Sequence, residues 1–77
     1  MKEFIEYIAK QLVDSPESVV VDETIDEEKR LLISIRVSQN DIGKVIGKKG
    51  RTAAAMRILL TAVAAKYGKR AALEILD

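Results

Sequence analysis

Residues 43–51 read GKVIGKKGR, and this stretch decides how the whole chain is interpreted. It combines three glycines with four basic residues, although glycine is costly to order and lysine is costly to bury. Three kinds of structure use such a stretch: a helix terminator, the phosphate-binding loop of a nucleotide hydrolase, and a clamp for nucleic acid. The hydrolase motif, G-x-x-x-x-G-K-S/T after a strand, is excluded. Only three residues separate Gly43 from Gly47, and Lys49 follows Lys48 where the motif needs a hydroxyl.

The two remaining interpretations differ in the purpose of Gly47 and Gly50. A G-x-x-G sequence by itself indicates only a sharp turn between two helices, with lysines on an exposed loop. The surrounding residues favour a nucleic-acid clamp. Glycine lets a sugar-phosphate backbone approach where a Cβ would clash, and Arg51 begins a helix whose N-terminal amides attract phosphate. Lys48 and Lys49 would add attraction that does not depend on base sequence.

Charged residues are unevenly distributed, although the net charge of the 77-residue chain is only +1. Residues 1–40 contain five basic and nine acidic residues, for a net charge of −4. Residues 41–77 contain eight basic and three acidic residues, for a net charge of +5, and no acidic residue lies between Asp41 and Glu74. This asymmetry predicts a polyanionic partner for the second half of the chain.

The composition argues against catalysis and against bound metals. The chain has no cysteine and no histidine, which removes thiol chemistry, the commonest general base and the commonest metal ligand. The acidic residues within 22–28 lack the glycine and the spacing of a calcium loop. We therefore predict a protein that is not an enzyme and holds no cofactor or metal. Since neither a signal-peptide pattern nor an apolar run of about 18 residues is visible, we expect it in the cytoplasm.

Hydrophobic periodicity predicts a helix and a β-hairpin in the first half of the chain. Apolar residues repeat with helical spacing over residues 4–13, and this helix should end near Asp14, because Pro16 disfavours helical geometry at the residue before it. Two strand-like segments follow at 18–25 and 31–37, and apolar and polar residues alternate in the second. The charged residues between them would form the hairpin turn, whose geometry the sequence leaves open.

The second half predicts two helices and a final strand. Ser38 and Asp41 fit the S-x-x-D capping pattern, in which the serine hydroxyl accepts a hydrogen bond from the amide three residues on. A short helix follows and breaks at Gly47, a longer one runs over residues 51–67 with Gly68 as its C-cap, and residues 71–76 form a strand. The order is α-β-β-α-α-β, which indicates an α+β fold.

The stretch IGKVIGKKGR (42–51) resembles the signature of K-homology (KH) domains, in which a GXXG loop clamps about four nucleotides of single-stranded RNA. The order of elements resembles the type II, bacterial arrangement. The likeness covers the whole chain, including YIAKQLVDSPESV and the terminal LEILD, and is similar to the KhpA family of small bacterial single-KH proteins. It implies one KH domain over residues 1–77, with a three-stranded mixed sheet, three helices on one face, and RNA binding without catalysis.

The resemblance also implies which residues meet RNA. The clamp and its basic flanks would comprise, in chain order, Lys44, Gly47, Lys48, Lys49, Gly50 and Arg51. Ile42, Val45 and Ile46 would partly line the apolar groove for the bases, although the first two can equally belong to the core. Residues 31–37 would form the opposite wall of this groove. With one Phe and two Tyr in the chain, base stacking is limited, so we expect modest affinity and little sequence discrimination.

The long helix carries two apolar stripes, whereas a helix in this fold needs only one buried face. The first stripe is Ala55, Ile58, Ala62 and Ala65, and the second is Met56, Leu59, Leu60 and Val63. Either both stripes belong to the core, or Met56, Leu59 and Val63 pack against another subunit.

The resemblance implies a homodimer, or a heteromer with a larger KH-containing protein of the KhpB kind, acting as an RNA chaperone or post-transcriptional regulator. Two paired clamps would hold a longer strand with higher avidity. The alternative is a dimerising scaffold whose RNA contact is secondary.

Overall fold

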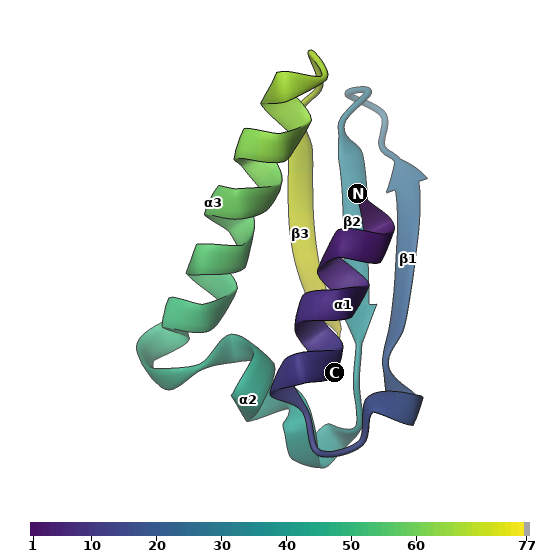
Figure 1. The fold of residues 1–77 in the computed structure, drawn as a ribbon. Coiled ribbons are helices and arrows are strands. Elements are labelled where there is room, and N and C mark those ends of the chain that lie inside the picture. The colour runs from purple at the N-terminus through teal and green to yellow at the C-terminus, as the bar shows by residue number, and fades with distance from the viewer. Residues whose placement is uncertain (77) are drawn as a thin grey trace.

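The computed structural model describes residues 1–76, and it has three α-helices and three strands in the predicted order (Figure 1). The predicted α+β fold is therefore confirmed. Its helices and strands are α1 (Lys2–Leu12), β1 (Val20–Ile25), β2 (Leu31–Arg36), α2 (Ile42–Ile46), α3 (Arg51–Lys66) and β3 (Ala71–Leu76). Single 3-10 turns lie at Pro16–Ser18, Gln39–Asp41 and Lys48–Gly50.

The three strands form one mixed sheet in the order β1-β2-β3. β1 pairs with β2 in antiparallel register, with Val21 opposite Ile35, and β2 pairs with β3 in parallel register, with Ile33 opposite Leu73. The parallel pair requires a long connection, which α2 and α3 provide. β2 is therefore the central strand, and β1 and β3 are the two edges.

The core lies between one face of the sheet and the three helices (Figure 1). Alternation in β2 decides this face, because Leu31, Ile33 and Ile35 are buried while the side chains between them turn to the other side. Ile5 and Ala9 of α1, Val45 of α2, and Met56 and Leu60 of α3 complete the same cluster.

The hairpin turn, left open by the sequence, is organised by one carboxylate. Asp26 Oδ1 accepts hydrogen bonds from the amides of Glu28 (2.9 Å) and Arg30 (2.8 Å), and Arg30 Nε donates to Oδ2 (2.8 Å). Lys29 adopts a positive φ of 64° inside the turn. The amide and side-chain hydrogen bonds from Arg30 lower the pKa of Asp26, although partial desolvation opposes them. Asp26 is thus the turn-forming residue, by the Asx mechanism.

The predicted ends of the elements in the second half are right in one case and wrong in another. The C-terminus of α3 is a Schellman motif, as the glycine that follows it suggested: Gly68 N donates to Ala65 O (2.9 Å) and Lys69 N to Ala64 O (2.9 Å). The Ser38 side-chain cap is wrong. Ser38 accepts the Asp41 amide with its backbone carbonyl (2.8 Å), and its side chain makes no capping bond.

No helix within residues 1–76 combines the length and the apolar character needed to cross a membrane.

Candidate nucleic-acid interface

Residues 47–50 form a tight loop between α2 and α3. Gly47 (φ 78°) ends α2, and Gly50 (φ 74°) immediately precedes α3. Both backbones lie in the region that favours glycine, so the predicted break between two helices is confirmed. Gly50 has no side chain that could cap α3, and its amide donates back to Gly47 O (3.0 Å). The amides of the first turn of α3 therefore have no side-chain acceptor next to the loop.

The two loop glycines are required for different reasons. A Cβ on Gly47 would clash with the Thr52 hydroxyl and lie 2.9 Å from the Thr52 amide nitrogen, so the end of α2 and the start of α3 are in contact there. A Cβ on Gly50 would meet nothing within 4 Å, so only the backbone conformation calls for glycine. Sequence reasoning missed Thr52, because this contact depends on how the two helices are placed rather than on local spacing.

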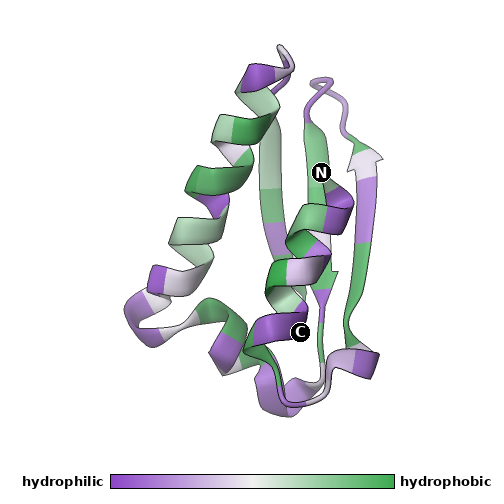
Figure 2. Ribbon diagram, in the orientation of Figure 1, coloured by the Kyte–Doolittle hydropathy of each residue, from purple (hydrophilic) through white to green (hydrophobic). Residues whose placement is uncertain are grey.

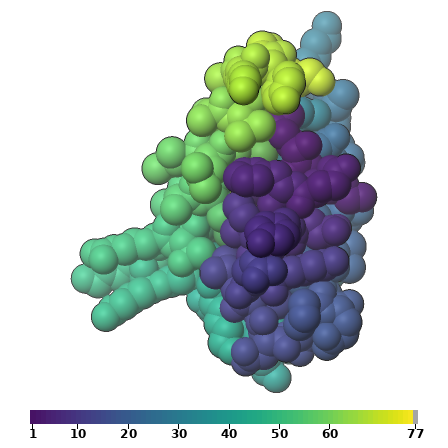
Figure 3. Space-filling model, in the orientation of Figure 1, coloured from purple at the N-terminus to yellow at the C-terminus, as the bar shows by residue number. Residues whose placement is uncertain are grey.

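Lys48, Lys49 and Arg51 are exposed around the loop. None of the three forms an ion pair within residues 1–76. In the space-filling view the segment that joins α2 to α3, in teal, extends long side chains away from the body of the molecule (Figure 3). These three residues therefore place positive charge in solvent, where an anionic ligand can reach it.

Lys44, the fourth predicted basic contact, lies in a different environment. Its Nζ donates a hydrogen bond to Asp14 Oδ2 and lies 3.7 Å from Asp41 Oδ1. The Asp14 hydrogen bond, opposed by partial desolvation and aided by the charge of Asp41, raises the pKa of Lys44. Lys44 is thus paired with two carboxylates of the same chain, although it is exposed, whereas its three basic neighbours have no such partner within residues 1–76.

The apolar triplet before the loop divides between core and surface. Val45 is completely buried, which decides the open question of its role in favour of the core and removes it from the surface available to bases. Ile42 is half-buried and packs against the core cluster. Ile46 remains exposed beside the loop. Of the three, Ile46 is the side chain a ligand at the loop would meet.

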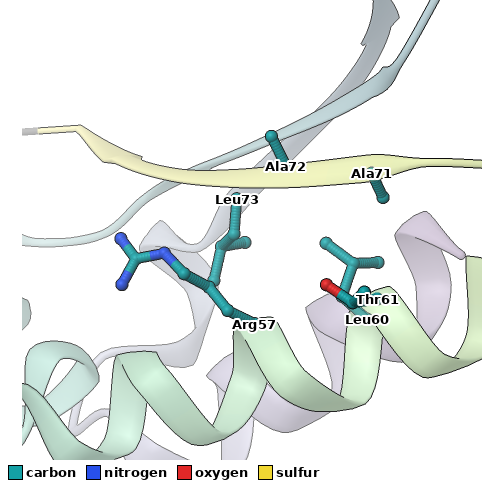
Figure 4. Close-up of a pocket in the computed structure, with 6 residues that line it drawn as sticks. All are labelled: Arg57, Leu60, Thr61, Ala71, Ala72 and Leu73. Atoms are coloured by element: carbon teal, nitrogen blue, oxygen red, sulfur yellow. The ribbon is translucent and has the colours of Figure 1, made fainter.

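Four of the seven residues expected to form the opposite wall of the groove, Leu31, Ile33, Ile35 and Val37, are buried in the core. Residues 31–37 include the central strand, and Ile33 and Ile35 are completely buried there. The strand beside α3 is the edge strand β3, and a cavity of about 240 Å³ lies between them (Figure 4). Its lining residues are Arg57, Leu60, Thr61, Ala71, Ala72 and Leu73. Arg57 and Thr61 are its polar members, and Arg57 lies at one end (Figure 4).

The second stripe of α3 is likewise misassigned in part. Met56 is only 2% exposed and belongs to the core, so it cannot contact a partner in this conformation. Leu59 is 47% exposed, and Val63 is half-buried at the edge of the core. The apolar surface that remains in solvent is the outer face of α3, defined here as Ala55, Ile58, Leu59, Ala62 and Ala65. Figure 2 shows green, hydrophobic segments on successive turns of this helix, between purple, hydrophilic ones.

Comparison with known proteins identifies relatives along the full chain. The family model described as KhpA/KhpB, KH domain, matches residues 2–75. A protein named "RNA-binding protein KhpA" from Aquifex aeolicus is 49% identical over 77 residues, which cover 100% of this chain and 96% of that protein. Proteins of the same name from Borreliella burgdorferi and Clostridium perfringens are 51% and 49% identical over 97% and 99% of this chain, and over 90% and 100% of their own lengths. No solved structure gave a significant match.

Proposed function

Because the chain belongs to the KhpA/KhpB family of KH domains, an RNA-binding family and not one of enzymes, we propose that residues 1–77 act as one KH domain that binds single-stranded RNA through its GXXG loop. In this proposal Gly47, Lys48, Lys49 and Gly50 hold the sugar-phosphate backbone, and Arg51 flanks them. The proposed setting is the cytoplasm, with a role as an RNA chaperone or post-transcriptional regulator.

One observation carries the proposal: the loop presents unpaired positive charge and open backbone at the same place. Lys48 and Lys49 have no acidic partner within residues 1–76, and the space beside Gly50 is empty to at least 4 Å. A phosphate can therefore approach the loop closely and exchange its counterions for lysine charge. A loop that served only to turn the chain would not need cationic side chains at both middle positions.

Two apolar features of the surface support weak selection among bases. Ile46 offers an exposed apolar contact next to Gly47, and the cavity between α3 and β3 is lined mainly by aliphatic and alanine side chains. Neither contains an aromatic ring on which a base could stack, so backbone contacts should dominate the affinity. Arg57 is the cationic side chain in that cavity (Figure 4).

A second part of the proposal concerns assembly. The outer face of α3 is apolar and exposed, including Ile58 at 70% and Leu59 at 47%. An apolar helix face of this kind favours burial against another protein, either a second copy of this chain or a larger KH-containing protein of the KhpB kind. Two joined clamps would increase avidity for one strand without new base contacts. The same face supports the alternative function, a dimerising scaffold whose RNA contact is secondary.

The clamp is tested by replacing Lys48 and Lys49 with Asp and measuring binding of a fluorescently labelled, mixed-sequence single-stranded RNA. We expect the affinity to fall by more than about tenfold, because two phosphate contacts become repulsive, and the remaining binding to depend less steeply on salt. Circular dichroism should be unchanged, because both side chains lie in solvent.

The matched control is the double variant Lys2→Asp and Lys66→Asp, which makes the same change in net charge at the end of the molecule away from the loop (Figure 1). It should lose much less affinity than the loop variant. Equal losses in the two variants would show that binding follows overall charge and would contradict the clamp. Wild-type binding too weak to measure, together with stable dimers, would favour the scaffold.

A further inference from the structure

Asp41 is the one charged side chain that is buried among residues 1–76, with 2% of its surface exposed. Both of its carboxylate oxygens are used. Oδ1 accepts the amide of Asp14 at 3.2 Å, and Oδ2 accepts the amide of Ser15 at 3.1 Å. These donors lie 27 and 26 residues away in the sequence, in the segment that follows α1. Asp41 therefore joins the end of α1 to the start of α2.

Lys44 completes this group of contacts. It lies three residues after Asp41, within 3.7 Å of its Oδ1, and also pairs with the exposed carboxylate of Asp14. A buried carboxylate is costly unless it is both hydrogen-bonded and balanced by charge. Two backbone amides supply the hydrogen bonds, and the exposed Lys44 supplies the balancing charge from the surface. We call Asp14, Ser15, Asp41 and Lys44 the Asp41 anchor.

The position of α2 needs such an anchor because the helix has only five residues. Isolated helices shorter than about 12 residues are marginal in water, so tertiary contacts must hold α2 in place. Val45 and, in part, Ile42 pack against the core, and the Asp41 anchor adds polar contacts at the N-terminal end of the helix. The last residue of α2, Ile46, leads directly into Gly47 and the loop.

We propose that Asp41 is a positioning residue for the GXXG loop, and that Lys44 belongs to the Asp41 anchor rather than to the phosphate contacts. The proposal rests on the proposed function of the loop. Under this proposal the neighbouring lysines have different roles: Lys48 and Lys49 contact RNA, whereas Lys44 helps to hold α2, the helix that leads into the loop.

The first experiment compares Asp41→Asn with Val21→Ala. Asn keeps the shape of Asp41 and loses its charge and one acceptor, while Val21→Ala removes core volume on β1 and leaves the anchor intact. Hydrogen exchange and RNA affinity of both variants are measured under conditions in which circular dichroism shows that each variant is folded. For Asp41→Asn we expect faster hydrogen exchange at the amides of residues 47–50 and RNA affinity lower by about fivefold or more, which corresponds to about 1 kcal/mol. Val21→Ala should change neither, although it too lowers stability.

The second experiment compares Lys44→Ala with Lys48→Ala and serves also if Asp41→Asn does not fold. Lys44→Ala should make hydrogen exchange at the amides of the loop faster. It should leave the slope of log RNA affinity against log salt concentration unchanged. Lys48→Ala should leave exchange in α2 unchanged and reduce the slope by about 0.7, the value for one phosphate contact on a single strand. The inference is overturned if Lys44→Ala reduces the slope as Lys48→Ala does, or if neither anchor variant changes loop exchange. Loop exchange is measured without RNA, so a failure of the proposed RNA binding remains distinguishable from a failure of this inference.

Discussion

Lys49 adopts a φ of 57°, in the left-handed region where residues with a Cβ are strained. The strain lies in the centre of the GXXG loop, between two glycines that relieve it at their own positions. A glycine at 49 would remove it, yet the chain has lysine there. Strain retained at a binding loop is typical of residues whose side chain has a function.

Lys49→Gly is therefore expected to raise the free energy of unfolding by up to about 1 kcal/mol while RNA affinity falls. Lys48→Gly is the matched control: it removes the same charge at a position without positive φ, so it should lower stability, since glycine is more costly to order. Urea unfolding measures the first effect and RNA titration the second. A loss of stability in Lys49→Gly equal to that in Lys48→Gly would contradict the strain argument.

Among the elements, the β1–β2 hairpin shows how one side chain can set the geometry of a turn. Asp26 accepts two amides and the Arg30 guanidinium, and these hydrogen bonds hold its pKa below the ordinary value of 3.8. A carboxyl group with a lowered pKa in the folded state stabilises the protein above its unfolded pKa. This stabilisation is lost as the pH falls through the folded value.

We expect the wild-type protein to lose more stability between pH 7 and pH 3 than the Asp26→Asn variant, which has no carboxyl group to protonate at this turn. The control is Asp22→Asn on β1, whose carboxylate accepts no hydrogen bond within residues 1–76, and which should follow the wild type. Denaturant unfolding at the two pH values provides the measurement. Identical pH dependence in the wild type and Asp26→Asn would show that the turn carboxylate does not contribute.

The elements themselves follow closely from local pattern. Alternation predicts β2, and Gly47 and Gly68 correctly mark where the helices end, because these signals need only neighbouring residues. The Ser38 cap fails for the converse reason. The Asp41 amide donates to the Ser38 carbonyl instead of the hydroxyl, and the Asp41 carboxylate accepts amides of a segment distant in sequence, a contact that the local capping pattern does not contain.

At the scale of the whole molecule, the helices cover only one face of the sheet. α3 therefore buries only the side that packs against that face. Met56 and Leu60 fill that side, and the outer face of α3 is left in solvent with Ile58 and Leu59 exposed. The predicted interface therefore has to exclude Met56 and lie on the outer face of α3.

Leu59→Glu should convert a dimer to a monomer, because it places a charge in the proposed apolar interface, and should leave the fold intact. Met56→Glu should instead unfold the protein, because it buries a charge in the core. Lys66→Glu, an exposed charge change at the end of the same helix, is the control and should remain dimeric. Light scattering and circular dichroism separate these outcomes. A wild-type monomer, or a dimer that survives Leu59→Glu, would place the interface elsewhere.

Local sequence patterns are enough to predict the order of elements, the α+β class and the G-x-x-G break between two helices, because periodicity, capping and glycine conformation act over a few residues. The packing of the elements was needed to show which side of α3 is buried, that Val45 and Met56 lie in the core, and that β3 rather than β2 flanks α3. It also separated Lys44 from Lys48 and Lys49, which look alike in the sequence. The reason is physical: burial and charge pairing depend on residues such as Asp14 that lie about 30 positions away, and only folding brings them together.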